Sequence, residues 1–368
     1  MKRVIATGSL LCAFGLLTVP VSAFADSVGD FYKSKGLTMV IGTSPGGSYD
    51  SVARLMARHF GKKVPGQPSI VTQNRPGASG RVAANSLYNA GPRDGSVIAA
   101  LSQTLAFAQL LGQRGVKYDA SKFNWIGTPT QPVSVMVASN RKGVKSLLDA
   151  RKTELIVGAT SSTGANFIYP ALANYLFGTK LKIIIGYKGG NEVDLALDRG
   201  EIDVRGSGTW TNIKFDHPDW IKEKKVVLLI QNSLKKHPDL PNVPRFVDLA
   251  ENDDQRAVLN LMGQVASVGR PILTNRGVPA DRLAALRAAF DATMKDADFR
   301  ADAERLKLDL DPLGGTDLQK MIGEMLSVPK KVVDITNAAL ARNGTQCAKF
   351  TDPKYCRKAK KKKKKKKK

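Results

Sequence analysis

Three glycine-rich turns are the segments whose residue types and spacing could do chemistry. They cover residues 45–48, 75–80 and 160–164, and each lies between a short apolar run and apolar residues at helical spacing. Glycine lets the backbone approach a ligand closely, and the first N–H groups of a helix have no partner within that helix. The turns therefore predict a site for a carboxylate or phosphate anion. Each turn alone is weak support, because glycine turns between strands and helices are common.

Four charged side chains could contribute to such a site. Asp50 follows the first turn, where it could cap the helix or face the ligand. Arg75 and Arg270 could bind a carboxylate through two parallel hydrogen bonds, although a surface or structural role is favoured for Arg270. Arg205 ends an apparent strand and could also face the ligand.

Signals for an enzyme are poor. His59 lies late in a predicted helix, and His217 and His237 both precede prolines. The chain contains no P-loop and no metal-ligand spacing, and the dinucleotide fingerprint fits badly. We therefore expect no catalysis, no cofactor and no metal. A hydrolase stays an alternative, but its candidate hydroxyls lack an obvious histidine partner: Ser48, Ser79, Ser102 and Ser162.

The elements that must position these turns alternate between strands and helices. A first set of apolar runs covers residues 37–41, 69–72 and 97–101, and a second set covers 155–159, 182–185, 202–204 and 226–230. Such alternation predicts an α/β fold with two lobes, each a mainly parallel sheet flanked by helices. Because ligands bind beyond the carboxyl ends of parallel strands, turns from both lobes should face one cleft.

Length and charge agree with an exported protein of two domains. The chain has 368 residues, which is more than one core usually organises. Its first 25 residues carry Lys2 and Arg3, a mostly apolar stretch, Pro20 and an A-x-A triplet at 23–25. This pattern predicts a secretory signal and a periplasmic location, and Pro20 and the triplet disfavour the alternative of a membrane anchor.

The C-terminal segment after residue 344 is expected to be an extension. Cys347 and Cys356 are the only cysteines of the mature chain, and an oxidising compartment favours a disulfide between them over two free thiols or half of a metal site. Eleven of the 25 net positive charges lie in residues 357–368. This poly-Lys tail should be disordered, and it is either an attachment to an anionic membrane surface or an extension without a function.

Several motifs together resemble one family. The motifs occur in the same order as in the tripartite tricarboxylate transporter substrate-binding proteins. They are residues 45–54, 74–80, 92–95, 187–190, Asp194, Gly200, 202–204, 240–244 and 313–315. These proteins are also called Bug receptors and are TctC-like periplasmic solute receptors. The resemblance runs from about Leu37 to Gly344, which is nearly the whole mature chain.

The resemblance implies a two-lobed, type II-like periplasmic-binding-protein fold with the ligand cleft between the lobes. Lobe I would comprise residues 26–137 and 263–344, lobe II residues 138–262, and the extension residues 345–368. It implies a monomer that closes on a small organic anion, either a di- or tricarboxylate or an aromatic acid. Delivery would be to membrane permease subunits or to a signalling sensor, and no nucleic acid is expected as a partner.

The resemblance also implies the ligand contacts. They would come from backbone amides and hydroxyls of Gly46, Gly47, Ser48, Ala78, Ser79, Gly80, Ser102, Thr104, Ser162, Thr163 and Gly164. Asp50, Arg205 and Thr209 complete the expected ligand-binding set. The family often has an acidic residue shortly after the strand at 202–204, whereas this chain has Arg205. We hypothesise that the added positive charge suits a dianionic ligand.

Overall fold

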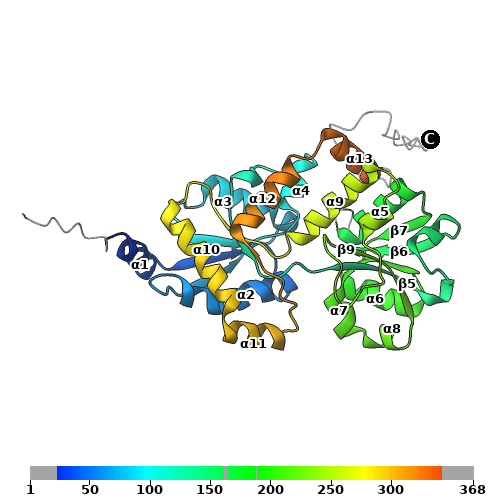
Figure 1. Ribbon diagram of the computed structural model, residues 1–368, viewed down its shortest axis with the longest axis horizontal. Coiled ribbons are helices and arrows are strands. Elements are labelled where there is room, and N and C mark those ends of the chain that lie inside the picture. The colour runs from blue at the N-terminus through cyan, green and yellow to red at the C-terminus, as the bar shows by residue number, and fades with distance from the viewer. Residues whose placement is uncertain (1–22, 161, 163, 188, 342–368) are drawn as a thin grey trace, which may run out of the picture.

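The computed structural model describes residues 23–341 except residues 161, 163 and 188. The body of the expected signal segment, Thr163, the Cys347–Cys356 pair and the poly-Lys tail therefore lie outside the described residues. The described chain forms two helix-flanked sheets that lie side by side (Figure 1). This arrangement confirms the α/β class.

The first sheet has six strands in the order β11-β4-β10-β3-β1-β2. Its strands are β1 (Leu37–Ile41), β2 (Ile70–Asn74), β3 (Val97–Ala100), β4 (Asn124–Thr128), β10 (Ile272–Thr274) and β11 (Leu313–Gly314). The helices of this lobe are α1 (Ala23–Lys35), α2 (Ser48–Phe60), α3 (Arg81–Ala90), α4 (Leu105–Leu110), α10 (Ala280–Lys295), α11 (Ala297–Arg305) and α12 (Gly315–Leu326).

The second sheet has five strands in the order β7-β6-β8-β5-β9. Its strands are β5 (Ser134–Ser139), β6 (Leu155–Ala159), β7 (Leu181–Ile185), β8 (Val204–Thr209) and β9 (Val226–Asn232). The helices of this lobe are α5 (Ala165–Phe177), α6 (Gly190–Arg199), α7 (Trp210–Asp216), α8 (Pro218–Lys222), α9 (Asp253–Ser267) and α13 (Lys330–Ala341).

Both sheets are mixed, and in each of them most strands run in one direction, as expected. In the first sheet β1 pairs in parallel with β2 and β3, whereas β10 is antiparallel to β3 and β4. In the second sheet β6 is parallel to β7 and β8, whereas β5 is antiparallel to β8 and β9. The physical reason is the path of the chain. β5 and β10 each begin where the chain has just crossed between the sheets, so they run away from the crossing.

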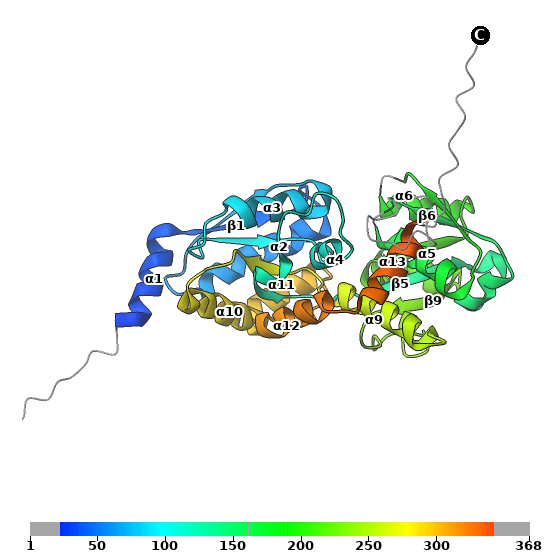
Figure 2. The ribbon, with the colours of Figure 1, turned by 90° about the horizontal axis from the view of Figure 1, so that it is seen from above.

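The chain crosses between the two sheets at residues 129–133 and 268–271, and again at 327–329 (Figure 2). The last crossing takes α13 onto α5 and α9 of the second sheet. These positions lie near the lobe boundaries expected at residues 137 and 262. We propose to place the boundaries at the crossings and to assign α13 to the second lobe.

Helix α2 is fixed against the first sheet because one of its faces is apolar. Leu55, Met56 and Phe60 are fully buried in one cluster with Met39 and Ile41 of β1. This packing determines where the N-terminus of α2, and with it the first glycine turn, can lie. No helix within the described residues is long and apolar enough to cross a membrane.

Candidate functional site

The carboxyl ends of the three parallel strands of the first sheet meet at one edge. The Arg75 N–H donates to the Ile41 carbonyl at 2.8 Å, and the Gly42 N–H donates to the Ala100 carbonyl at 3.0 Å. A Cβ at Gly80 would lie 3.5 Å from the Ser102 nitrogen. The hydroxyls of Ser102 and Thr104 are 2.9 Å apart. The structure therefore brings Gly80, Ser102 and Thr104 together at the carboxyl ends of β1 and β3.

The second turn has an unusual backbone. Ala78, Ser79 and Gly80 all have positive φ, at 46°, 55° and 84°. A residue with a Cβ rarely adopts positive φ, because this conformation is strained. Such strain persists only where the surrounding structure maintains it. Such conformations concentrate at functional sites, which is consistent with a ligand-binding role for this turn.

Asp50 is engaged inside the first lobe. Its carboxylate accepts hydrogen bonds from Arg54 Nε at 2.9 Å, Asn74 Nδ2 at 2.7 Å and the Gly46 N–H at 3.0 Å. The hydrogen bond from Arg54, followed by those from Asn74 and Gly46, lowers the pKa of Asp50 to about 2. The carboxylate thus ties the first turn to α2 and β2, and it takes up the Gly46 N–H that was expected to reach the ligand.

Arg205 is likewise engaged inside the second lobe. Its guanidinium is buried and forms an ion pair with the buried carboxylate of Asp194, and its Nη1 donates to the Ser207 carbonyl at 3.2 Å. His217 Nε2 also lies 3.3 Å from Asp194. The positive charge of Arg205 is therefore compensated by Asp194. The observed contacts give no support to the hypothesis that Arg205 favours a dianionic ligand.

The third turn follows β6 and leads to Gly164, the N-cap of α5. The Thr160 hydroxyl lies 3.4 Å from Asn166 Oδ1, so this turn is held to the first turn of α5. Ser162 is half-buried, and Thr163 lies outside the described residues.

A pocket of about 260 Å³ lies between the lobes. Its lining comprises Ser48, Ser51, Val52, Thr130, Pro132, Thr209, Thr211, Asn212, Phe215, Asp216, Arg270, Leu306, Lys307, Leu308 and Asp309. Of the expected ligand-binding residues, Ser48 and Thr209 line it. The other expected residues that the structure describes lie outside its lining. Sequence reasoning missed Thr211 and Asn212, because nothing local distinguishes them from other residues of a short helix.

Arg270, for which a surface or structural role was favoured, lies in the pocket lining. Its Nη2 donates to the Ser48 hydroxyl at 2.9 Å, and its guanidinium lies 4.2 Å from the centre of the Tyr49 ring. The Tyr49 hydroxyl donates to the Gly269 carbonyl at 3.3 Å. The N-terminus of α2 and the crossing at 268–271 therefore hold this side chain at the pocket wall. Arg75 instead lies exposed beside Ser86 and Gln73.

Within the described residues no group of three or more His, Cys, Asp or Glu side chains could hold a metal ion. The polar groups that the pocket offers to a ligand are therefore individual charged side chains and hydroxyls. A guanidinium beside a serine hydroxyl is a donor pair suited to a carboxylate.

Comparison with known proteins gives consistent results. No protein-family model matches the chain. A UPF0065 protein of Pseudomonas sp. strain P51 is 26% identical over 227 residues, which cover 60% of this chain and 65% of that protein. A UPF0065 protein of Bordetella bronchiseptica is 30% identical over 151 residues, which cover 41% of this chain and 42% of that protein. The matches therefore span less than two thirds of these relatives.

Solved structures with the same fold cover more of the chain. A TctC solute-binding protein from Polaromonas superposes with a TM-score of 0.64 at 16% identity, over 82% of this chain and 98% of that one. R. palustris Rpa4515 with adipate gives 0.58 at 18% identity, over 82% and 97%. MatC from Rhodopseudomonas palustris with bound malate gives 0.55 at 21% identity, over 82% and 98%.

The chain is similar to UPF0065 proteins in sequence and to TctC and BugD solute-binding proteins in fold. The two-lobed periplasmic-binding-protein fold implied by the resemblance is thereby confirmed. In this Bug/TctC-like chain, Arg270, Ser48 and the hydroxyls at the start of α7 form the inter-lobe pocket.

Proposed function

We propose that the chain is a periplasmic solute-binding receptor that captures a small organic carboxylate between its lobes. The observation that carries the proposal is the inter-lobe pocket, in which Arg270 and Ser48 of one lobe face Thr209 and Asn212 of the other. The fold neighbours solved with malate and with adipate support a carboxylate as the ligand class. Substrates within the proposal are di- and tricarboxylates and other small organic acids, aromatic acids included.

Capture in this proposal is a shift between open and closed arrangements of the lobes. An anion held by Arg270 on the first lobe can also accept hydrogen bonds from Thr209 and Thr211 on the second lobe. A ligand that contacts both lobes binds the closed form more tightly, so it shifts the population towards closure. No bond is made or broken. The loaded receptor would then deliver its ligand to permease subunits of the tripartite tricarboxylate type.

The test is a thermal-shift screen of the purified protein against malate, adipate, citrate, benzoate and hexanoate. A ligand that binds only the folded protein raises Tm, by an amount equivalent to about 2.7 kcal/mol at a concentration of 100 Kd. The proposal expects a rise with at least one acid and none with the corresponding amide. If every acid leaves Tm unchanged at millimolar concentrations, the receptor proposal is wrong.

A further inference from the structure

The pocket chemistry points to a narrower ligand class than the fold does. We propose that Arg270 selects the ligand and that the pocket takes a small monocarboxylic acid with an apolar body. The inference rests on the proposed receptor function and specifies its substrate class. The proposed monocarboxylate differs from the dicarboxylate ligand that the fold neighbours with malate and adipate would suggest.

The first argument is the balance of charge in the pocket. Arg270 has contacts with a hydroxyl and an aromatic ring, and no ion pair with an acidic residue is found for it among the described residues. Its Nε is buried and lacks a hydrogen-bond partner within the described part of the chain. A buried, unpaired donor of this kind is costly unless an acceptor satisfies it. One ligand carboxylate, bound through Nε and Nη, would satisfy it.

Two of the three remaining charged lining residues are acidic. Asp216 and Asp309 place two carboxylates on the pocket lining, and Asp309 lies 3.1 Å from His237 Nε2. Lys307 is exposed and lies 5.2 Å from the centre of the Phe215 ring. A second ligand carboxylate would share the pocket with the carboxylates of Asp216 and Asp309, and like charges in a partly desolvated site repel. The pocket therefore suits one negative charge.

The second argument is the rest of the wall, which is largely apolar. The apolar side chains that line the pocket are Val52, Pro132, Phe215, Leu306 and Leu308. Val52 is buried, whereas Phe215 and Leu306 are among the exposed large hydrophobic residues of the chain. Covering this surface with an apolar ligand body is favourable, at roughly 25 cal/mol per Å². The volume of about 260 Å³ accommodates a small organic acid.

Isothermal titration of the full chain with a matched set of six-carbon ligands tests the inference. The set is hexanoate, adipate, hexanamide and 6-aminohexanoate. Relative to hexanoate, hexanamide lacks the charge of the carboxylate, whereas adipate and 6-aminohexanoate carry an additional negative or positive charge at the other end. We expect hexanoate to bind at least about tenfold more tightly than adipate, and hexanamide to lose binding by about 10- to 100-fold. Tighter binding of adipate would overturn the monocarboxylate assignment, and tighter binding of 6-aminohexanoate would overturn the apolar body.

Variants of two arginines test the role of Arg270. Arg270→Gln should weaken hexanoate binding by about 10- to 100-fold, and Arg270→Lys should restore only part of it because an ammonium cannot form the two parallel hydrogen bonds. Arg75→Gln is the matched control, since Arg75 also bonds neutral side chains but lies outside the pocket. The ligand-free Tm of each variant reports folding.

The outcomes separate this inference from the receptor proposal. Binding of hexanoate to Arg270→Gln with the wild-type affinity would overturn the role of Arg270. Binding of adipate or malate without hexanoate would overturn the substrate class while the receptor proposal stands. No binding of any acid to a folded wild-type protein would overturn both.

Discussion

At the scale of single residues, Asp50 and Arg270 show how the first turn is built. Asp50 is a buried carboxylate that collects donors from Arg54, Asn74 and the Gly46 backbone. Arg270 is a cation that reaches Ser48 on the other side of the same turn. The turn is thus held from within by an anion and flanked at the pocket by a cation. In the proposed receptor, Asp50 would support the site, whereas Arg270 would face the ligand.

Replacing Asp50 tests this support. Asp50→Asn removes the negative charge to which Arg54 donates. Because the folded state lowers the pKa of Asp50 to about 2, we expect the variant to lose about 2 kcal/mol of unfolding free energy at neutral pH. Because the folded state holds this carboxyl ionised, its contribution is complete above about pH 4 and disappears as pH falls towards 2. Urea unfolding at pH 7 and pH 3 measures both effects. Equal stability differences between wild type and variant at the two pH values would contradict this assignment.

The sequence could identify part of the site at this scale. The spacing of glycine, serine and apolar residues placed Ser48 at the start of a helix beyond a strand, where the structure has it. Arg270 could not be assigned, because its neighbours in space, Ser48 and Tyr49, are more than 200 residues away in the chain. The partner of Arg205 could not be assigned either, because Asp194 becomes adjacent to it only when α6 packs beside β8.

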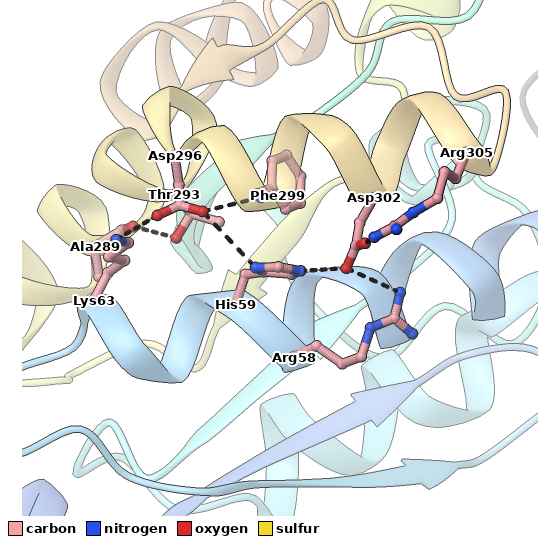
Figure 3. A network of polar contacts seen from close by, with 9 residues as sticks. All are labelled: Arg58, His59, Lys63, Ala289, Thr293, Asp296, Phe299, Asp302 and Arg305. Carbon is pink, nitrogen blue, oxygen red and sulfur yellow. Dashed lines mark hydrogen bonds and ion pairs between the residues drawn. The ribbon is translucent and has the colours of Figure 1, made fainter.

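At the scale of elements, α2 is held at its two ends by different interactions. Its N-terminus carries the first turn, and near its C-terminus His59 Nε2 lies 2.8 Å from Asp302 Oδ2 of α11. Figure 3 shows His59 pointing at Asp302, which also contacts Arg58 and Arg305. Lys63 Nζ is 2.5 Å from Asp296 Oδ2 just before α11. The network therefore fixes the helix that supports Ser48 to the helix preceding the segment 306–309.

Removing Asp302 should loosen this pair of helices. Asp302→Ala leaves the buried His59 without its acceptor, and we expect a loss of about 1–3 kcal/mol of unfolding free energy. Glu304→Ala is the control, because Glu304 is exposed on the same helix. Urea denaturation of the two variants measures the difference. If both variants lose the same stability, the network does not hold α11 on α2.

The sequence predicted the elements better than the sheet they form. The apolar runs at 37–41 and 155–159 match β1 and β6 in full, because four of the five residues in each run are buried, as in a strand covered on both faces. The expected strand at 202–204 begins instead at Val204 and runs to Thr209, since three glycine and serine residues weakened its pattern. Antiparallel pairing of β5 and β10 depends on where the chain crosses between lobes, which no local pattern encodes.

At the scale of the whole molecule, two crossings of the chain contact each other. The Arg270 N–H donates to Thr128 Oγ1 at 2.9 Å, which joins the crossing at 268–271 to the end of β4. Gly269 has φ of 65°, and a Cβ there would overlap the Thr130 carbonyl oxygen. The two crossings can lie this close only because residue 269 has no side chain. Any change in the angle between the lobes must therefore move the residues of this contact.

Gly269→Ala should therefore disturb both stability and binding. The left-handed conformation costs about 1–2 kcal/mol for alanine, and displacing the Thr130 carbonyl adds about 1–3 kcal/mol. The matched control is Gly178→Ala at the C-cap of α5, where φ is 68° but no atom lies within 4 Å of the added Cβ. Urea unfolding should give the larger loss for Gly269→Ala, and titration with hexanoate should show weaker binding for that variant alone, because the displaced backbone carries Arg270. Equal effects of the two substitutions would mean that the crossings tolerate separation, and that the position of Arg270 does not depend on them.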